Sequence, residues 1–374
     1  MGDPLNHRAS RPLRIGLVGA GQISGAYLRT FPQLGNLRLT AVADLDLERA
    51  KAAAADVPGA RALALPELYA ADDVDLVLNL TVPAAHAEVA HAAIAAGKHV
   101  YGEKPLAATT AEARALLRAA EQAGVRVGCA PDTVLGTGVQ TARAALDAGD
   151  IGAPVAATAF MTTPGHERWH PAPEFYYRPG GGPLLDMGPY YLTALVTLLG
   201  PVRRVTGFSS TVRGTRTIGS GPRAGTDFPV EVATHVTGVL EHASGALSTL
   251  LMSFEVWAAQ LPRIEVYGTA GSLSVPDPNG FDGPVRLFRA EADGWEDLPV
   301  RGGYAGASRG YGVSDLARAL STGTPHRASG QLAEHVLDVM ESLLAAGESG
   351  HAVRITSNCE RPAAVPAGAR PEEA

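Results

Sequence analysis

The sequence has little lysine and little cysteine, and both shortages restrict its interpretation. Lys51, Lys98 and Lys104 are its only lysines, so arginine carries nearly all of its positive charge. Cys129 and Cys359 are its only cysteines, which excludes a disulfide framework and a cysteine-based metal site. It also lacks long apolar runs, near its start and elsewhere, so we expect neither a secretory signal nor a membrane span.

The overall composition is that of a folded protein with two domains. Hydrophobic residues make up 46% of the 374 residues and charged residues 18%, which excludes a disordered chain. Single cores stop growing at about 250–300 residues, so this length favours two domains. The formal net charge of −7 argues against nucleic-acid binding, which needs a basic surface. We therefore expect a cytoplasmic protein with neither nucleic-acid nor membrane partners.

Residues 13–130 alternate short apolar runs with alanine-rich segments. This alternation predicts βαβ units around a parallel sheet, so the expected fold class is α/β. The expected strands are 13–18, 37–43, 74–80, 99–101 and 125–129, and the expected helices are 23–31, 47–55, 84–96 and 110–123.

The pattern changes after about residue 150. A helix is expected over 183–199, and the runs between 203 and 275 alternate polar and apolar residues. Such alternation predicts an antiparallel sheet with one face wetted or covered by a partner. Two late helices are expected over 311–322 and 329–346, while 276–306 should be loop with at most one strand. The expected organisation is a disordered N-terminus (1–12), a Rossmann domain (13–130), a C-terminal domain (131–358) and a disordered tail (359–374).

A glycine-rich turn after the first expected strand predicts a dinucleotide site. Gly19 permits the tight turn, and Gly21 lets the backbone approach a pyrophosphate where the first helix begins. Ser24 stands where a third Gly or Ala is usual and is still small enough for close helix–strand packing. The cofactor residues expected in this turn are Gly19, Gly21, Gln22 and Ile23.

Asp44, at the end of the second expected strand, indicates which dinucleotide is bound. A carboxylate about 20 residues beyond the glycine turn accepts the ribose hydroxyls of NAD and repels a 2′-phosphate. NAD is therefore expected in preference to NADP, although Arg49 lies one helical turn further along.

Two further strand ends carry candidate residues. Thr81 and Pro83 follow the third strand and should lie beside the dinucleotide, while His86 is either a cofactor contact or a solvated histidine at a helix start. Glu103 and Lys104 follow the fourth strand and are also expected to contact the cofactor. Unlike arginine, a partly buried lysine shifts its pKa readily and can exchange protons.

A run of three glycines, 180–182, precedes a second motif on the expected helix 183–199. Asp186 and Tyr190 are four residues apart, so they share one helix face. The glycines allow another element to approach this helix start closely. We interpret Asp186 and Tyr190 as parts of an active site.

These motifs, taken in order, resemble the glucose–fructose oxidoreductase/inositol dehydrogenase (Gfo/Idh/MocA) family over roughly residues 13–358. The resemblance implies an N-terminal Rossmann domain and a C-terminal α/β domain with a large open, mainly antiparallel sheet, which commonly mediates dimers or tetramers. It also implies reversible oxidation of one hydroxyl of a sugar or cyclitol by a nicotinamide cofactor. Lys104 matches the catalytic lysine of the family, Asp186 its motif aspartate, and Tyr190 the place where many members carry histidine.

The tyrosine changes the expected acid–base chemistry. A free tyrosine has a pKa of about 10, and a neighbouring ammonium favours its phenolate. Tyr190 is therefore a candidate general acid or base with Lys104 as its electrostatic partner, and the proton acceptor stays open between them.

The expected substrate wall comes from segments outside these motifs. Asp132 is a candidate for holding sugar hydroxyls, and Trp169 either stacks on a sugar face or anchors its loop. His166 and His170 have the spacing of a metal pair but no evident third ligand, so no metal is expected. The expected substrate residues are Lys104, Asp132, His166, Trp169, His170, Tyr176, Asp186 and Tyr190, with Arg309, Tyr311 and His335 as weaker candidates.

The sequence leaves three functions open. The leading one is an NAD-dependent sugar or polyol dehydrogenase acting as a homodimer or homotetramer. The second is a glycosidase or lyase in which bound NAD transiently oxidises the sugar at C3. The third is a non-enzymatic sugar or NAD sensor, against which the retained Lys104 and Tyr190 argue.

Overall fold

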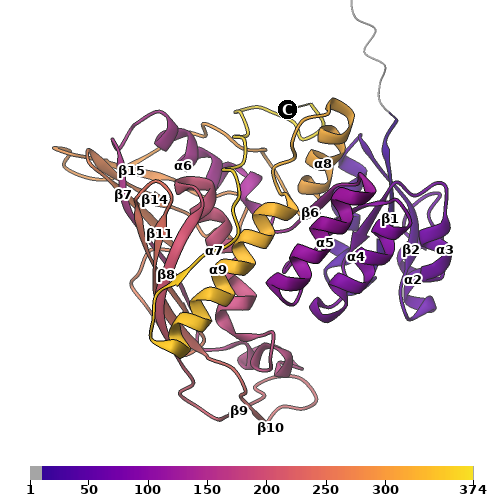
Figure 1. Ribbon diagram of the computed structural model, residues 1–374, viewed down its shortest axis with the longest axis horizontal. Helices are drawn as coiled ribbons and strands as arrows, with labels where there is room; N and C mark the ends of the chain where they lie inside the picture. Colours follow the sequence, from indigo (N-terminus) through magenta and orange to yellow (C-terminus); the bar gives the residue numbers. More distant parts are fainter. Residues whose placement is uncertain (1–10, 374) are drawn as a thin grey trace, which may run out of the picture.

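The computed structural model describes residues 11–373, which form two domains packed against each other (Figure 1). In the described chain, the N-terminal domain has a six-stranded parallel sheet of order β3-β2-β1-β4-β5-β6. Its strands are β1 (Leu13–Val18), β2 (Leu37–Ala43), β3 (Arg61–Ala62), β4 (Leu76–Asn79), β5 (His99–Gly102) and β6 (Val127–Cys129). The strand order reverses between β1 and β4, where doubly wound folds bind dinucleotides.

The helices of this domain follow the predicted alternation. They are α1 (Ser24–Thr30), α2 (Leu47–Ala55), α3 (Leu65–Ala70), α4 (His86–Ala95) and α5 (Thr110–Ala123). Asp46 caps α2 by accepting from the amides of Glu48 and Arg49, and Thr109 forms a capping box with Glu112 at α5. The short pieces β3 and α3 escaped prediction because neither has a long periodic pattern.

One face of the Rossmann sheet is covered by a helix from the C-terminal half of the chain. Val313 and Leu316 of α8 (Tyr311–Thr322) belong to the same buried apolar cluster as Leu17, Leu39 and Leu78. A fully buried leucine or valine contributes about 1.5–3 kcal/mol. The Rossmann core therefore extends beyond the expected boundary at residue 130.

The C-terminal domain of the described chain is built on a nine-stranded sheet of order β16-β15-β14-β13-β7-β12-β11-β8-β17. Its strands are β7 (Pro154–Thr162), β8 (Val202–Ser210), β11 (His235–His242), β12 (Leu247–Ser253), β13 (Ile264–Gly268), β14 (Gly271–Val275), β15 (Arg286–Arg289), β16 (Glu296–Asp297) and β17 (Val353–Arg354). The neighbours pair antiparallel except β7 with β12. The expected large, mainly antiparallel sheet is confirmed.

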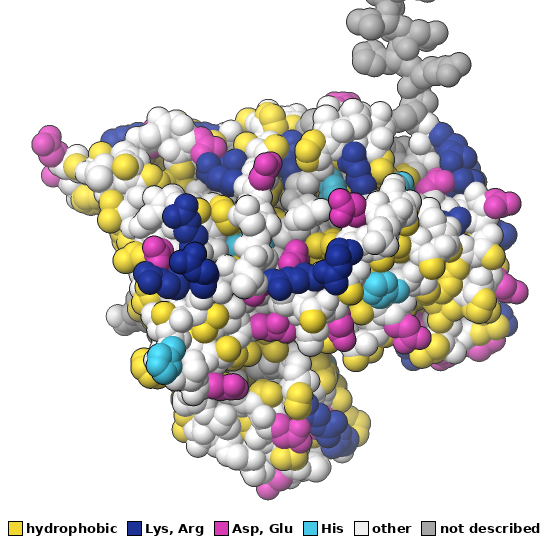
Figure 2. Space-filling model, viewed as in Figure 1, with side chains coloured by type: hydrophobic (Ala, Val, Ile, Leu, Met, Phe, Trp, Pro, Cys, Tyr) yellow, Lys and Arg dark blue, Asp and Glu magenta, His cyan; other side chains and the backbone are white. Residues whose placement is uncertain are grey.

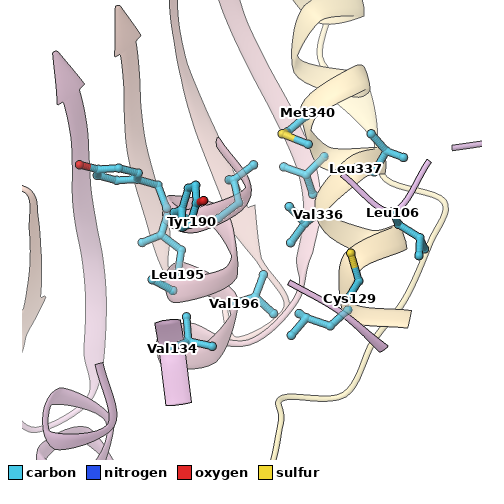
Figure 3. Close-up of a cluster of buried hydrophobic side chains, with 14 of the residues drawn as sticks. Leu106, Cys129, Val134, Tyr190, Leu195, Val196, Val336, Leu337 and Met340 are labelled. Atoms are coloured by element: carbon cyan, nitrogen blue, oxygen red, sulfur yellow. The ribbon is translucent and has the colours of Figure 1, made fainter. Parts of the chain in front are cut away.

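Three helices cover one face of this sheet: α6 (Thr137–Asp147), α7 (Gly182–Leu199) and α9 (Gly330–Ser349). In Figure 1, α7 and α9 run side by side between the large sheet and the Rossmann domain. Figure 3 shows Val196 on the side of α7 that faces Val336 of α9, while Leu195 lies on the opposite side of α7. Cys129 of β6 belongs to the same cluster, so one apolar core joins the two domains.

The register of the large sheet places apolar side chains on the face opposite the three helices, which we call the outer face. Phe208, Thr237, Leu251 and Phe160 occupy one cross-strand row, and side chains of directly paired residues point to the same side. Phe208 is 70% exposed. The helix side of the sheet is marked by Gly238, where an added Cβ would lie 2.4 Å from Leu343 of α9.

A two-stranded arm of β9 (Thr215–Thr217) and β10 (Asp227–Pro229) projects beyond the sheet (Figure 1). Its buried Arg216 forms ion pairs with Glu167 and Glu255 at 2.6 Å each. Figure 2 shows a recess between this arm and the Rossmann domain, with acidic and basic side chains interspersed over the visible face.

The chain also has short 3₁₀ turns: η1 (Phe31–Gln33), η2 (Pro83–Ala85), η3 (Thr133–Leu135), η4 (His166–Arg168) and η5 (Glu174–Tyr177).

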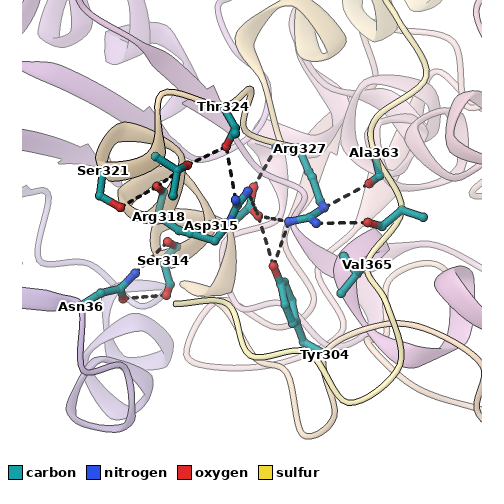
Figure 4. Close-up of polar contacts among 12 residues, drawn as sticks. Asn36, Tyr304, Ser314, Asp315, Arg318, Ser321, Thr324, Arg327, Ala363 and Val365 are labelled. Carbon is teal, nitrogen blue, oxygen red and sulfur yellow. Dashed lines mark hydrogen bonds and ion pairs between the residues drawn. The ribbon is translucent and has the colours of Figure 1, made fainter. Parts of the chain in front are cut away.

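The predicted disorder of the tail 359–374 is wrong for its described part. Arg361 donates to the carbonyl oxygen of Thr197 at 2.7 Å, and the amide of Val365 donates to Gln140 Oε1 at 2.8 Å. Arg327, itself bound to Asp315, donates to the carbonyl oxygens of Ala363 and Ala364 at 3.1 Å each. Figure 4 shows this network between α8 and the tail. Hydrogen bonds from Arg327 and Arg361 to backbone carbonyls thus order a segment that has no hydrophobic periodicity.

Two other expectations concern irregular segments. The region 276–306 contains two short strands, β15 and β16, which is one more than expected. The expected disorder of 1–12 falls largely outside the described residues; Arg11 lies inside them and forms an ion pair with Asp75 at 3.2 Å. No helix of the described chain has the length and apolar character that a membrane span requires.

Candidate active site

The glycine turn after β1 lies against the chain that follows β4. Gly19 has φ of +95°, and an added Cβ would lie 2.8 Å from the carbonyl group of Leu80. A Cβ on Gly21 would meet no atom within 4 Å. The turn is therefore tight at Gly19 and open at Gly21, as a backbone that receives a pyrophosphate requires. Gly21, Gln22 and Ile23 are exposed at this edge.

Asp44 follows β2 directly and is fixed by two backbone amides. Its Oδ2 accepts from the amide of Ala20 at 2.8 Å, and its Oδ1 accepts from that of Asp46 at 2.9 Å. Its side chain remains 11% exposed, with Arg49 Nη1 at 3.9 Å from Oδ1. A carboxylate held beside the glycine turn fits the two ribose hydroxyls of a dinucleotide.

Thr81 and Pro83 lie at the open edge after β4, as expected, but His86 does not. The His86 ring is 2% exposed, with Nδ1 at 2.6 Å from the carbonyl oxygen of Pro105 and Nε2 at 3.0 Å from that of Thr81. Both alternatives for this side chain, a cofactor contact and a solvated histidine at a helix start, are therefore wrong. His86 instead ties the loop after β4 to the loop after β5.

Glu103 also has an internal role. Its carboxylate is buried, accepts from the Tyr27 hydroxyl at 2.9 Å and accepts from the amide of Lys104 at 3.1 Å. Because its oxygens are committed inside the fold, the expected cofactor contact through this side chain is wrong. Asn79, which the sequence reasoning missed, supports the neighbouring loop by bonding to the Thr81 hydroxyl at 2.7 Å.

Lys104 and Asp186 meet between the two domains. Lys104 Nζ donates to Asp186 Oδ1 at 2.8 Å and to the Asp186 carbonyl oxygen at 2.6 Å. Asp186 Oδ2 lies 3.1 Å from His166 Nε2. Both side chains of the ion pair are 17% exposed, so water screens it little.

The pair controls the charge of both groups. Burial opposes the ammonium of Lys104, but the Asp186 carboxylate outweighs burial and raises the pKa of Lys104 above its ordinary value. Burial likewise opposes the Asp186 carboxylate, but Lys104 and His166 lower the pKa of Asp186 to about 2. Lys104 is thus a stable hydrogen-bond donor in the free protein and a poor proton acceptor.

Tyr190 lies one helical turn after Asp186, as the four-residue spacing predicts. Lys104 Nζ lies 5.4 Å from the centroid of the Tyr190 ring, so the two side chains are adjacent. The Tyr190 hydroxyl accepts a hydrogen bond from Arg309 Nη2 at 3.1 Å. Because Lys104 donates to Asp186, the cation bonded to this hydroxyl is Arg309.

Asp132 does not face a substrate. It is fully buried, and its Oδ2 accepts from the amides of Gly310 and Gly312 at 2.9 and 3.0 Å. Its Oδ1 faces Arg309 Nη1 at 3.6 Å. The prediction that Asp132 holds sugar hydroxyls is therefore wrong, because the start of α8 encloses it.

Aromatic side chains form one wall beside His166. Its ring centroid lies 4.5 Å from those of Tyr176 and Phe254 and 5.3 Å from that of Trp169. Burial raises the pKa of Tyr176 to about 12, so its hydroxyl stays protonated at neutral pH. Trp169 is 58% exposed and can present its ring to a ligand.

The remaining candidates lie apart from this wall or at its rim. The His170 ring packs between Trp169 and Phe175, and its Nδ1 accepts from the amide of Ala172 at 3.1 Å. His335 is fully buried, and burial lowers its pKa to about 4, so the suggestion that it joins the site is wrong. The Tyr311 ring packs on Tyr304. Over residues 11–373, no three His, Cys, Asp or Glu side chains group as metal ligands would.

The fold and this geometry define a class of protein. A Rossmann domain offers a dinucleotide edge, and a buried lysine–aspartate pair with a tyrosine lies between it and a second domain. That combination is typical of nicotinamide-dependent oxidoreductases, in which a hydride moves to or from the cofactor while a side chain handles the proton.

Family comparisons identify the group within this class. The oxidoreductase family model with an NAD-binding Rossmann fold matches residues 13–130, and the GFO/IDH/MocA C-terminal domain model matches residues 139–274. The chain therefore belongs to the Gfo/Idh/MocA family of oxidoreductases, and the resemblance drawn from its motifs is confirmed.

Individual relatives agree with this assignment. The dTDP-3,4-didehydro-2,6-dideoxy-alpha-D-glucose 3-reductase of Streptomyces violaceoruber is 30% identical over 355 residues, covering 92% of this chain and 97% of that protein. Inositol 2-dehydrogenase of Klebsiella pneumoniae is 38% identical over 154 residues, covering 38% of this chain and 44% of that protein. The crystal structure of an NAD-binding oxidoreductase from Klebsiella pneumoniae aligns with a TM-score of 0.79 at 26% identity, covering 93% of this chain and all of that one.

Proposed function

We propose that this enzyme uses NAD to interconvert a hydroxyl and a keto group on a sugar, glycoside or cyclitol. The observation that carries the proposal is the Lys104–Asp186 pair beside Tyr190, at the carboxyl edge of the Rossmann sheet. The named relatives that act on a dTDP-linked deoxysugar and on inositol support this substrate class.

The side chains divide the work of oxidation. NAD, when bound, takes up the hydride that leaves the substrate carbon. Lys104, kept as an ammonium by Asp186, donates a hydrogen bond to the substrate oxygen. Tyr190 as phenolate accepts the hydroxyl proton, and its phenol returns a proton to the oxygen in the reverse direction. His166 holds the second oxygen of Asp186 and keeps the carboxylate oriented.

The aromatic wall supports a carbohydrate as substrate. Sugar rings have an apolar face of C–H groups and a polar rim of hydroxyls. The exposed ring of Trp169 offers a stacking surface, while Tyr176 and His170 offer polar atoms near it. We assign substrate contact to these residues together with Lys104, Asp186 and Tyr190.

The test is NADH formation, followed by absorbance, across monosaccharides, cyclitols, glycosides and dTDP-sugars, with product analysis. At least one substrate should give NADH and a keto product. Leaving-group release without net NADH would instead support the NAD-dependent lyase. Turnover of neither kind on any compound would contradict the proposal.

Lys104→Ala is the matching variant. A well-placed donor or acid–base group contributes about 10²–10⁴-fold, so turnover should fall by about that factor while NAD binding stays within a few-fold. Lys51→Ala is the control, because Lys51 is an exposed lysine paired with Glu48 on α2. If Lys104→Ala retains full turnover, the site assignment fails.

We further propose that NAD is preferred over NADP and that the enzyme is a homo-oligomer. Asp44 beside the glycine turn supports the cofactor preference, since its charge repels a 2′-phosphate. The apolar row on the outer face of the large sheet supports a second copy as its cover. Dimer or tetramer formation through this sheet would remove Phe208 from water.

A further inference from the structure

Arg309 holds the hydroxyl that the proposed chemistry uses. Its Nη2 donates to the Tyr190 hydroxyl at 3.1 Å, and its guanidinium carbon lies 5.3 Å from the centroid of the Tyr190 ring. Tyr190 is 6% exposed and the Arg309 side chain 14%, so the contact is shielded from bulk water. Arg309 precedes α8, whereas Tyr190 belongs to α7, so the contact depends on the docking of the two domains.

Asp132 fixes the arginine from behind. Two backbone amides bind its Oδ2, and its Oδ1 faces Arg309 Nη1. Within residues 11–373 neither Asp132 Oδ1 nor Arg309 Nη1 has a hydrogen-bond partner, and the two atoms lie 3.6 Å apart. Each compensates the buried charge of the other. A rigid carboxylate therefore aims the guanidinium at Tyr190.

The charged and titratable groups around Tyr190 come from four directions. Lys104 approaches its ring from the loop after β5, Asp186 precedes it on α7, Tyr176 lies on η5, and Arg309 arrives from the segment before α8. Lys104 and Asp186 largely neutralise each other through their 2.8 Å contact. Asp132 faces the other nitrogen of Arg309, Nη1, so Nη2 remains in hydrogen-bond contact with the phenol oxygen, and arginine, unlike lysine, cannot lose its proton in a protein.

We propose that Arg309 is the positioning residue that makes Tyr190 the proton acceptor, by holding its oxygen and stabilising its phenolate, with Asp132 fixing Arg309. This inference rests on the proposed function. In oxidation the carbon–hydrogen bond breaks and gives its electron pair to NAD as hydride, and the hydroxyl proton passes to the Tyr190 oxygen. Arg309 exchanges no proton in either direction.

The first experiment needs no substrate. Tyrosinate absorbance is titrated against pH in the full-length wild type and in Arg309→Gln. From each curve, the curve of the same protein carrying Tyr190→Phe is subtracted, which isolates the ionisation of Tyr190. A cation at this range shifts an ionisation by about 1–3 pH units. The midpoint of Tyr190 should therefore rise by about that amount in Arg309→Gln. An unchanged midpoint in the folded variant would overturn the proposal.

Arg309→Lys is the second variant and guards against loss of folding. It keeps the charge without the planar fork, so its midpoint should lie between those of the wild type and Arg309→Gln. If Arg309→Gln shows no cooperative unfolding transition, Arg309→Lys decides alone: a raised midpoint supports the proposal, and one equal to the wild type overturns it.

The second experiment measures kcat against pH with the substrate found above. The alkaline rise of kcat should move to higher pH in Arg309→Gln by the same interval as the Tyr190 midpoint, with activity recovered at high pH and KM changed less. An equal loss of kcat at every pH would mean that Arg309 has only a structural role, and it would overturn the proposal. If the wild type oxidises nothing, the proposed function fails, while the absorbance titration still decides the role of Arg309.

Discussion

The charge of each ionisable residue in this site is determined by its hydrogen-bonded partners. Lys104 is kept charged because it donates to Asp186, and Asp186 is kept charged because it accepts from both Lys104 and His166. Removing one member of such a buried pair leaves the other uncompensated, which costs more than the pair contributes. The charge state of the site is therefore a property of the group.

Asp186 gives a prediction on stability against pH. Its folded pKa of about 2 lies below its unfolded value, so its contribution is complete above the unfolded pKa and is lost as pH falls through the folded one. The shift corresponds to about 2 kcal/mol. The difference in unfolding free energy between the wild type and Asp186→Asn should thus shrink between about pH 4 and pH 2. Urea titrations at several pH values measure it, and a constant difference would contradict the assignment.

Asp44 gives a prediction on cofactor choice. Asp44→Ala removes the expected acceptor of the ribose hydroxyls and the charge that repels a 2′-phosphate. NAD affinity should fall by about 10- to 100-fold, the range of one charged hydrogen bond, while NADP affinity rises. Fluorescence titration of both cofactors measures this, with the exposed Glu48→Ala as control. Equal wild-type affinities for the two cofactors would remove Asp44 from this role.

How far residue roles can be predicted from sequence depends on the distance between partners. Asp186 and Tyr190 share a helix face, so their spacing predicts their neighbourhood. The role of Asp132 was misjudged because its partners, Gly310 and Gly312, come 178 and 180 residues later. Arg309 was only a weak candidate for the same reason: nothing local to it indicates that α8 docks on the Rossmann sheet.

At the scale of elements, periodicity decided what could be predicted. Helix α7 and the strands β1, β2 and β4 have strong patterns, and the structure has them where the patterns indicate. Strand β7, central in the large sheet, was missed because its buried side includes the small residues Ala157 and Ala159. Small side chains suit a strand pressed between sheet neighbours and helices, but they give a weak hydrophobic signal.

The turn between β1 and α1 predicts two different outcomes for two glycines. Gly19→Ala places a Cβ 2.8 Å from the Leu80 backbone at a φ of +95°, so it should destabilise the fold by about 1–3 kcal/mol and weaken NAD binding. Gly21→Ala meets no atom of the free protein, so it should leave stability unchanged and still weaken NAD binding. Thermal unfolding with and without NAD separates the two. Destabilisation by Gly21→Ala in the free protein would refute the contrast.

At the scale of the whole molecule, the two domains are interlocked instead of being joined only by a linker. The C-terminal half contributes α8 to the Rossmann core, and the tail returns to bind Arg327 behind α8. The alternation of patterns predicted two domains and their fold class correctly. The docking of α8 and the ordering of the tail could not be predicted, because the partners of both lie far away in the sequence: buried apolar residues of the Rossmann sheet for α8, and arginine–carbonyl hydrogen bonds for the tail.

The interlocked molecule still leaves the outer face of its large sheet open, and this leads to the prediction on assembly. A stable interface buries about 800 Å² per partner, which a flat sheet face of several strands can supply. Phe208, 70% exposed in the single chain, lies on this face on β8, the second strand from one edge of the sheet, next to Thr237 of β11. Phe208→Asp should place a charge in the interface and lower the mass measured by light scattering to that of one chain.

Val300→Asp is the matched control, because Val300 is 61% exposed but lies outside the sheet. It should leave the mass of the assembly unchanged. Because Arg309 and Tyr190 meet within one chain, the Phe208→Asp monomer should retain NAD binding and an unchanged Tyr190 ionisation. A wild type that is already monomeric at micromolar concentration would contradict the assembly, and the outer face would then need another explanation for its apolar row.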